Sequence, residues 1–132
     1  NDLVAGTVQV MLIQAGGAIG TNIRAGKLVG LATSGRERTP KYPDLPTIGE
    51  FYPGFETTSW IGLLAPAGTP RAVIQKLNST LAGILATQDI KEKFDVQAAD
   101  IVASSPQHFG ELIKSESAKW GKIIREKNIR ID

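Results

Sequence analysis

Short apolar runs, separated by turns rich in glycine or proline, recur along the chain and predict β-strands. Residues 8–13 and 28–33 are both such runs, and 60–65 and 101–103 are two further candidates. The residues between the first two runs favour a short helix, which Gly26 can close in the left-handed conformation. Strand, helix and strand at this spacing predict a parallel βαβ unit with a right-handed crossover.

Apolar residues that recur every three or four positions predict two longer helices. In the first, Thr69 is expected to cap the free amides and Pro70 to be the first helical residue. Its apolar face comprises Val73, Leu77, Leu81, Ile84 and Leu85, and it should run to about Thr87. A shorter helical segment is expected at 90–94.

The second long helix is expected to begin at Ser105-Pro106, again a capping residue followed by proline, and to end near Lys127. The segment 34–58 separates the two halves of the chain. It contains four prolines and is predicted to be a connector with one helical turn at 47–51. The fold class that follows is α/β.

Composition places the chain among soluble globular proteins. It has 132 residues, of which 42% are hydrophobic and 21% charged, so it can form one domain or part of a larger one. The 15 basic and 13 acidic residues are spread along the chain, which argues against a nucleic-acid-binding stripe. Cysteine is absent, which excludes disulfides and thiolate chemistry.

The sequence carries no segment that would embed it in a membrane. No apolar run approaches the roughly 18 residues that suggest a transmembrane helix. The first residues lack the architecture of a signal peptide, and there is no initiator Met. We therefore expect the chain to be a processed or truncated fragment.

The turn from Ala15 to Gly20 is the most informative candidate site. It nearly matches the dinucleotide-binding fingerprint, but Ala15 replaces the first glycine, and the end of the second predicted strand carries Thr33-Ser34-Gly35-Arg36 where an acidic residue is expected. A small nucleotide-dependent enzyme is therefore the weaker interpretation. Two others remain: the glycines permit a tight turn and close packing of the helix on a sheet, or the backbone amides and the helix start bind an anion such as a carboxylate.

Other side chains give no catalytic or metal site. His108 is the only histidine and is expected at the surface, far in sequence from any arrangement that would make a triad. The acidic residues show no calcium-loop pattern, so no metal and no cofactor are predicted. Trp60 and Trp120 have apolar neighbours and are expected to pack in the core.

Several stretches resemble the Bug family of receptors for tripartite tricarboxylate transporters, in the family's order and spacing. These stretches are Asp2 to Gly6 with Val8 to Met11, Ile23 to Leu28, Arg36 to Glu50, Thr58 to Pro70, and Lys119 to Ile124. The resemblance implies part of a two-lobed periplasmic-binding-protein fold (type II, Venus-flytrap). Residues 1–57 would belong to the second lobe and 58–132 to the C-terminal part of the first, after a hinge crossing.

The resemblance also implies a function. A family member would be a non-enzymatic periplasmic receptor that binds a small carboxylate and presents it to membrane transporter subunits. The residues expected to contact the ligand are Ile13, Gln14, Ala15, Gly16, Gly17 and Ala18, with most of the pocket contributed by residues upstream of Asn1. The acidic residue that the family often has in this loop is missing, which argues against an amino-acid ligand. A truncated, self-associating interaction module without ligand binding is the alternative.

Overall fold

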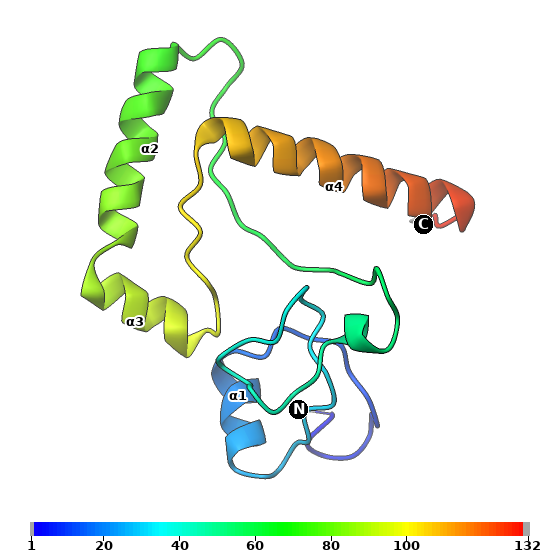
Figure 1. Cartoon of the computed structure of the whole chain (residues 1–132). Helices are drawn as coiled ribbons and strands as arrows, with labels where there is room; N and C mark the ends of the chain where they lie inside the picture. Colours follow the sequence, from blue (N-terminus) through cyan, green and yellow to red (C-terminus); the bar gives the residue numbers. More distant parts are fainter. Residues whose placement is uncertain (1, 131–132) are drawn as a thin grey trace. The chain divides into compact units, whose positions relative to one another are not determined.

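The computed structural model describes residues 2–130, so the predicted lobe limits at Asn1 and Asp132 lie outside the described residues. Its helical elements are α1 (Gly17–Arg24), the 3-10 turn η1 (Ile48–Glu50), α2 (Arg71–Leu85), α3 (Gln88–Val96) and α4 (Pro106–Glu126), shown in Figure 1. Residues 2–130 contain no named strand.

The chain divides into two compact units. The first unit contains the residues up to Ile61 together with Gln88–Ile101, and therefore holds α1, η1 and α3. The second contains Gly62–Thr87 and the residues from Val102 onward, and holds α2 and α4. The sequence predicted that the chain passes from one lobe to the other once, near residue 57. In the structure the chain passes into the second unit after Ile61 and comes back to the first unit for Gln88–Ile101, which includes α3. The assignment of these units to two lobes stays a prediction.

The four predicted strands are wrong for this structure. The one parallel pairing among the described residues is an isolated bridge between Thr33 and Thr47. Thr33 N–H donates to Pro46 O at 2.9 Å, and Ile48 N–H donates to Thr33 O at 2.8 Å. A strand exists only where a neighbouring strand accepts its backbone hydrogen bonds, and the other apolar runs have no such neighbour in residues 2–130.

The predicted helices are confirmed, with one correction at a helix start. Ser105 caps α4 by accepting from His108 N–H at 3.2 Å, with Pro106 as the first helical residue. At the start of α2, however, Pro70 is the N-cap and Thr69 caps nothing. The Thr69 hydroxyl instead donates to Pro66 O at 2.8 Å, because the tight turn before the helix places that carbonyl within its reach.

The second unit brings α2 and α4 into contact. The Asn78 side-chain amide on α2 donates to Ser104 O, just before α4, at 2.9 Å. Gly62 lies against the ring of Phe109, so closely that a Cβ on Gly62 would lie 2.0 Å from Phe109 Cζ. The glycine is therefore what permits the segment before α2 to approach α4.

Within residues 2–130 no apolar side chain is fully buried. Of the predicted core positions on α2, Val73, Leu77 and Ile84 are about half exposed, and Leu81 and Leu85 are only partly buried. Trp60 and Trp120 are 43% and 40% exposed, so their assignment to a core is wrong for this structure. The indole N–H of Trp120 donates to Glu116 at 2.7 Å. An apolar helix face predicts burial only if another element covers it.

Acid should weaken the turn around η1. Arg38 binds both carboxylate oxygens of Glu50, at 2.8 and 2.6 Å, and Thr47 N–H donates to the same carboxylate at 2.9 Å. The hydrogen bonds from Arg38 and from the Thr47 amide lower the pKa of Glu50 to about 2, from an ordinary value of 4.5. Because the folded pKa lies below the unfolded one, this stabilisation is present above pH 4.5 and is lost as the pH falls toward 2.

We expect the Glu50→Gln variant to lose this part of the acid dependence. Its stability between pH 4.5 and 2 should fall less steeply than that of the unmodified chain, as followed by circular dichroism. Glu37→Gln, at an exposed acidic side chain of the same connector, is the matched control. Parallel acid curves for the unmodified chain and Glu50→Gln would contradict the role of the Arg38 pair.

Candidate functional site

The predicted ligand loop leads directly into α1. Gly16 is the N-cap of this helix, with φ −91° and no side-chain cap, and Gly17 follows at φ +54°. Only glycine takes the second conformation without strain. The first amides of a helix have no partner within it, so this turn leaves N–H donors available.

The end of α3 packs against the loop. A Cβ added to Gly16 would lie 2.0 Å from Gln97 O and 2.8 Å from Gln97 Cα, and one added to Gly17 would lie 3.6 Å from Gln97 Oε1. The backbone of Gln97 therefore touches Gly16, and its side-chain amide lies beside Gly17. Gly16 thus permits a close approach, but to the backbone of Gln97 and not to the sheet that the sequence predicted.

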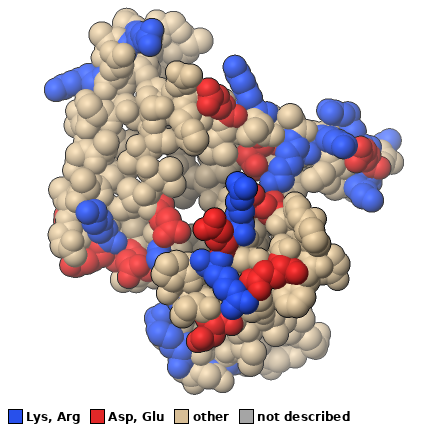
Figure 2. All heavy atoms as spheres, viewed as in Figure 1, with Lys and Arg blue, Asp and Glu red and all other residues tan. Residues whose placement is uncertain are grey.

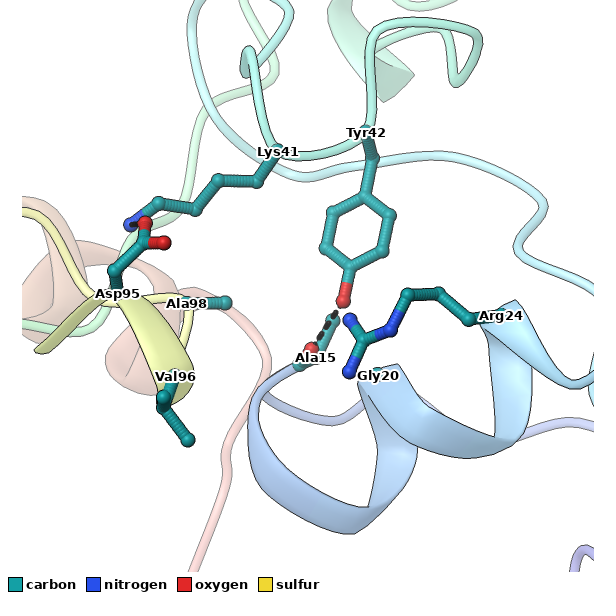
Figure 3. A pocket seen from close by; sticks show the side chains of 8 residues that line it. All are labelled: Ala15, Gly20, Arg24, Lys41, Tyr42, Asp95, Val96 and Ala98. Carbon is teal, nitrogen blue, oxygen red and sulfur yellow. Dashed lines mark hydrogen bonds and ion pairs between the residues drawn. The ribbon is translucent and has the colours of Figure 1, made fainter. Parts of the chain in front are cut away.

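Tyr42 holds the loop from another side. Its hydroxyl donates to Ala15 O, as Figure 3 shows. A Cβ on Gly20 would lie 2.9 Å from the same hydroxyl and 3.0 Å from Ala15 O. Gly20 is thus the second position where the absence of a side chain allows a close approach, and it is buried.

Next to Tyr42, Lys41 joins the connector to the residues that follow α3. Its ammonium donates to Ala99 O at 2.9 Å and lies 3.0 Å from Asp100 and 3.6 Å from Asp95. The Lys41 side chain is only 21% exposed, whereas the two carboxylates are largely exposed. Lys41 and Tyr42 together tie the connector to both the loop and the end of α3.

A cavity of about 150 Å³ lies between these segments of the first unit. In Figure 3 the guanidinium of Arg24, from the last turn of α1, lies beside the Tyr42 hydroxyl, and Asp95 faces Lys41. The Lys41 charge is balanced by its carboxylates, and Arg24 adds a cation. The lining residues are Ala15, Gly20, Arg24, Lys41, Tyr42, Asp95, Val96 and Ala98.

The six residues predicted as ligand contacts are divided by the structure. Ile13, Gln14 and Ala18 are exposed, whereas Ala15, Gly16 and Gly17 are half-buried. Of the six, only Ala15 lines the cavity, and Gly16 and Gly17 lie beside Gln97. Their contact with a ligand stays a prediction.

The sequence reasoning missed the residues that surround the loop, namely Arg24, Lys41, Tyr42, Asp95, Val96, Gln97 and Ala98. Tyr42 lies 27 positions after Ala15, and Lys41 lies 58 positions before Ala99. Hydrophobic periodicity reports only neighbours along one element, so it contains no signal for such pairs. The two prolines near Tyr42 were the only local sign of an ordered connector.

We expect Tyr42→Phe to loosen the loop without removing the ring. Losing the hydrogen bond to Ala15 O should destabilise the first unit by about 1 kcal/mol, the usual contribution of a neutral hydrogen bond. The effect should appear in urea unfolding and as faster amide exchange in residues 14–18. Tyr52→Phe, at a tyrosine that is 70% exposed in the same unit, serves as control and should leave both unchanged. Equal effects of the two variants would contradict the role of Tyr42.

The described residues show neither a metal centre nor a membrane span. No three His, Cys, Asp or Glu side chains among residues 2–130 are grouped so that they could hold a metal ion. None of the described helices is both long and apolar enough to cross a membrane. Figure 2 shows acidic and basic side chains interspersed on the face in view. His108 is exposed, as predicted.

Comparison with protein families gives a match over nearly the whole chain. The model of the tripartite tricarboxylate transporter family receptor matches residues 1–129. A UPF0065 protein from the tcbD-tcbE intergenic region of Pseudomonas sp. (strain P51) is 36% identical over 128 residues, which are 96% of this chain and 38% of that protein. Protein BugT of Bordetella pertussis is 30% identical over 98% of this chain and 40% of its own length.

A solved structure shows a similar arrangement. The periplasmic binding protein BugD superimposes with a TM-score of 0.71 and 30% sequence identity, covering 84% of this chain and 38% of that protein. The chain therefore spans about two fifths of the length of these three relatives.

Proposed function

Because the chain belongs to the tripartite tricarboxylate transporter receptor family, we propose that it is part of a periplasmic receptor that captures a small organic carboxylate and presents it to a membrane transporter. The match over residues 1–129 is the observation that carries this proposal. Capture would proceed by closure of two lobes, driven by ligand contacts that exist only in the closed state. The receptor would have no catalytic role.

The loop that begins α1 supports a carboxylate as the ligand. Between Ile13 and Ala18 there is no acidic side chain, so nothing in this segment would repel an anion. The amides at the start of α1 can donate to carboxylate oxygens, and the helix dipole favours negative charge at the same end. The side-chain amide of Gln14 would add a donor.

Gln97 is a further expected contact. Its amide lies beside Gly17, and its backbone is held against Gly16. A ligand carboxylate in front of the helix start would therefore meet the Gln97 side chain as well as the loop. It would accept from Gln97 Nε2 after a rotation of the amide, because the atom beside Gly17 is the acceptor Oε1. Lys41 and Tyr42 would act through the loop and α3, whose positions they hold, and would not touch the ligand.

The proposal is best tested in a receptor of full family length. In a chimera, this chain replaces the matching 128 residues of the Pseudomonas relative. Mono-, di- and tricarboxylates, amines and nucleotides are then screened by thermal shift and calorimetry. We expect at least one carboxylate to raise the melting temperature and bind with a measurable Kd. Stabilisation by amines or nucleotides, with none by any carboxylate, would contradict the proposed ligand class.

A matched pair of variants locates the site. Gln14→Ala should weaken carboxylate binding about tenfold, which corresponds to one hydrogen bond to a charged group of about 1.4 kcal/mol. Gln75→Ala, at an exposed position on α2, should leave the Kd unchanged. Equal Kd values in both variants would show that Gln14 does not contact the ligand. The family assignment would not be affected.

A further inference from the structure

The last turns of α4 and the residues that follow it carry a local excess of positive charge. Residues 114–130 contain six basic and two acidic side chains, a net charge of +4, whereas the rest of the chain contains nine basic and eleven acidic side chains and has a net charge of −2. The six form no uninterrupted run in the sequence, but Figure 2 shows several Lys and Arg side chains along this part of α4. The excess therefore belongs to one surface and not to the whole chain.

Helix geometry places three of these basic residues on one side of α4. At about 100° per residue, Lys114, Lys122 and Arg125 fall within about 80° around the helix axis. All three side chains are exposed. The same geometry places the apolar residues on the opposite side, namely Phe109, Leu112, Ile113, Trp120 and Ile123. The charged side is thus separate from the apolar side of the helix.

Most of these charges have no carboxylate partner. Lys119 pairs with Glu116 at 3.3 Å, one turn away on α4. Lys122 lies 3.9 Å from Glu126, and both side chains are largely exposed, so this pair is weak. The basic residues of this surface that have no salt bridge within residues 2–130 are Lys114, Arg125, Lys127 and Arg130.

The helix dipole explains only part of this arrangement. Cations in the last turn of a helix are stabilised by the partial negative charge at its C-terminus. This effect is confined to about one turn, so it applies to Arg125 and Lys127 but not to Lys114, about three turns earlier. A local excess of charge that the helix itself does not need indicates a surface for electrostatic attraction of a partner.

A broad anionic surface fits these charges better than a compact anion. The charges stand on separate, exposed side chains of a helix surface, and the cavity near Tyr42 belongs to the first unit. Clusters of about four to eight Lys and Arg on an amphipathic helix are typical of segments that bind anionic lipid headgroups. A transporter receptor also works beside a membrane; this last argument rests on the proposed function, whereas the charge arrangement does not.

We propose that residues 114–130 bind the surface of a bilayer that contains anionic phospholipid. The contacts with lipid phosphates are made by Lys114, Lys122, Arg125, Lys127 and Arg130. The attraction is electrostatic and reversible, and each basic side chain near such a surface increases the affinity about fivefold. Binding of this kind concentrates the receptor at the membrane that holds its transporter.

The first experiment is vesicle flotation, with this chain and with the full-length chimera described above, in the absence of any carboxylate ligand. Both proteins should bind vesicles of phosphatidylcholine mixed with phosphatidylglycerol and not vesicles of phosphatidylcholine alone. Binding should be lost between about 0.1 M and about 1 M salt. Equal binding to both kinds of vesicle would indicate adsorption through apolar side chains and would overturn the proposal, as would the absence of binding to the mixed vesicles.

The same flotation assay separates this proposal from two others. Because no carboxylate is present, failure of the proposed ligand class leaves the lipid result unaffected, and failure of lipid binding leaves the ligand class unaffected. The second alternative is an acidic protein surface as the partner. Retention of the chain on a poly-glutamate column, together with no binding to the mixed vesicles, would indicate that partner and overturn the proposal.

Substitutions locate the surface. The triple variant Arg125→Gln, Lys127→Gln and Arg130→Gln should bind the mixed vesicles at least tenfold more weakly, with unchanged helix content by circular dichroism. A control triple variant removes the same number of charges at exposed positions on α2 and α3: Arg71→Gln, Lys76→Gln and Lys91→Gln. The control should weaken binding by less than about threefold. An equal loss in both would show that total net charge alone attracts the vesicles, and would contradict a specific surface.

A fluorescent label tests the same surface without removing charge. The chain has no cysteine, so Ala118→Cys, on the charged side of α4, and Ala72→Cys, on α2, each give a single labelling site. Both positions are exposed. On mixed vesicles that carry a quencher in the lipid headgroups, the label at 118 should be quenched and the label at 72 should not. Equal quenching of both labels would overturn the assignment of the membrane contact to α4.

Discussion

Gly16→Ala is expected to destabilise the first unit by about 2–3 kcal/mol, at the upper part of the range for overpacked sites. The new Cβ would lie 2.0 Å from Gln97 O and 2.4 Å from Gln97 C, which are backbone atoms that cannot rotate away. At φ −91° Gly16 is in a conformation open to any residue, so the effect is one of contact alone. The end of α3 would have to move away from the ligand loop.

The measurement is urea unfolding by circular dichroism, together with amide exchange in residues 95–101. Gly83→Ala is the matched control, because Gly83 lies inside α2 and a Cβ there would meet nothing within 4 Å. That variant should stabilise by about 0.5–1 kcal/mol through helix propensity. A Gly16→Ala variant that changes stability by less than about 0.5 kcal/mol would show that the loop and α3 do not touch as described.

Lys41→Met is expected to cost about 1–2 kcal/mol and to release the residues after α3. The substitution removes a charged donor from Ala99 O and a cation from between Asp95 and Asp100, while keeping a flexible side chain of similar size. The two carboxylates are exposed, so water compensates part of the loss, and the value lies below that of a buried pair. Added salt should reduce the part of the stability loss that comes from the ion pairs with Asp95 and Asp100, and should leave the part from the hydrogen bond to Ala99 O unchanged.

Lys93→Met is the control for this prediction. Lys93 also pairs with an aspartate, at 3.7 Å, but both partners are about 70% exposed and lie one turn apart on α3. Its loss should cost less than about 0.5 kcal/mol. Combining Lys41→Met with Asp100→Asn should give less than the sum of the two single effects, and strict additivity would contradict the coupling.

Local features of the chain follow from the sequence because their causes are local. Ser105-Pro106 starts α4, and Gly26 adopts φ +67° after α1, because each needs only a cap or a positive φ within a few residues. The start of α2 shows the limit of this reasoning. Thr69 has the right chemistry for a cap, but a nearby carbonyl competes for its hydroxyl.

The candidate site was located only in part. The sequence identified the Gly-rich loop, and the structure shows close approaches at Gly16 and Gly20, to Gln97 and Tyr42 and not to a sheet. Gln97 lies at the end of a predicted helix and Tyr42 in the predicted connector, and neither position indicates by its sequence that it contacts the loop. Only the folded chain brings them to the loop.

By itself, the sequence determined the helices, the Ser105 cap of α4, the glycine positions and the resemblance to a receptor family, since these depend on residues close together or on motifs in order. Only the tertiary structure decided whether the apolar runs become strands and which side chains enclose the loop. A run such as 28–33 has strand composition whatever surrounds it, but backbone pairing needs a neighbour in space. Within residues 2–130 that neighbour exists at Thr33 alone.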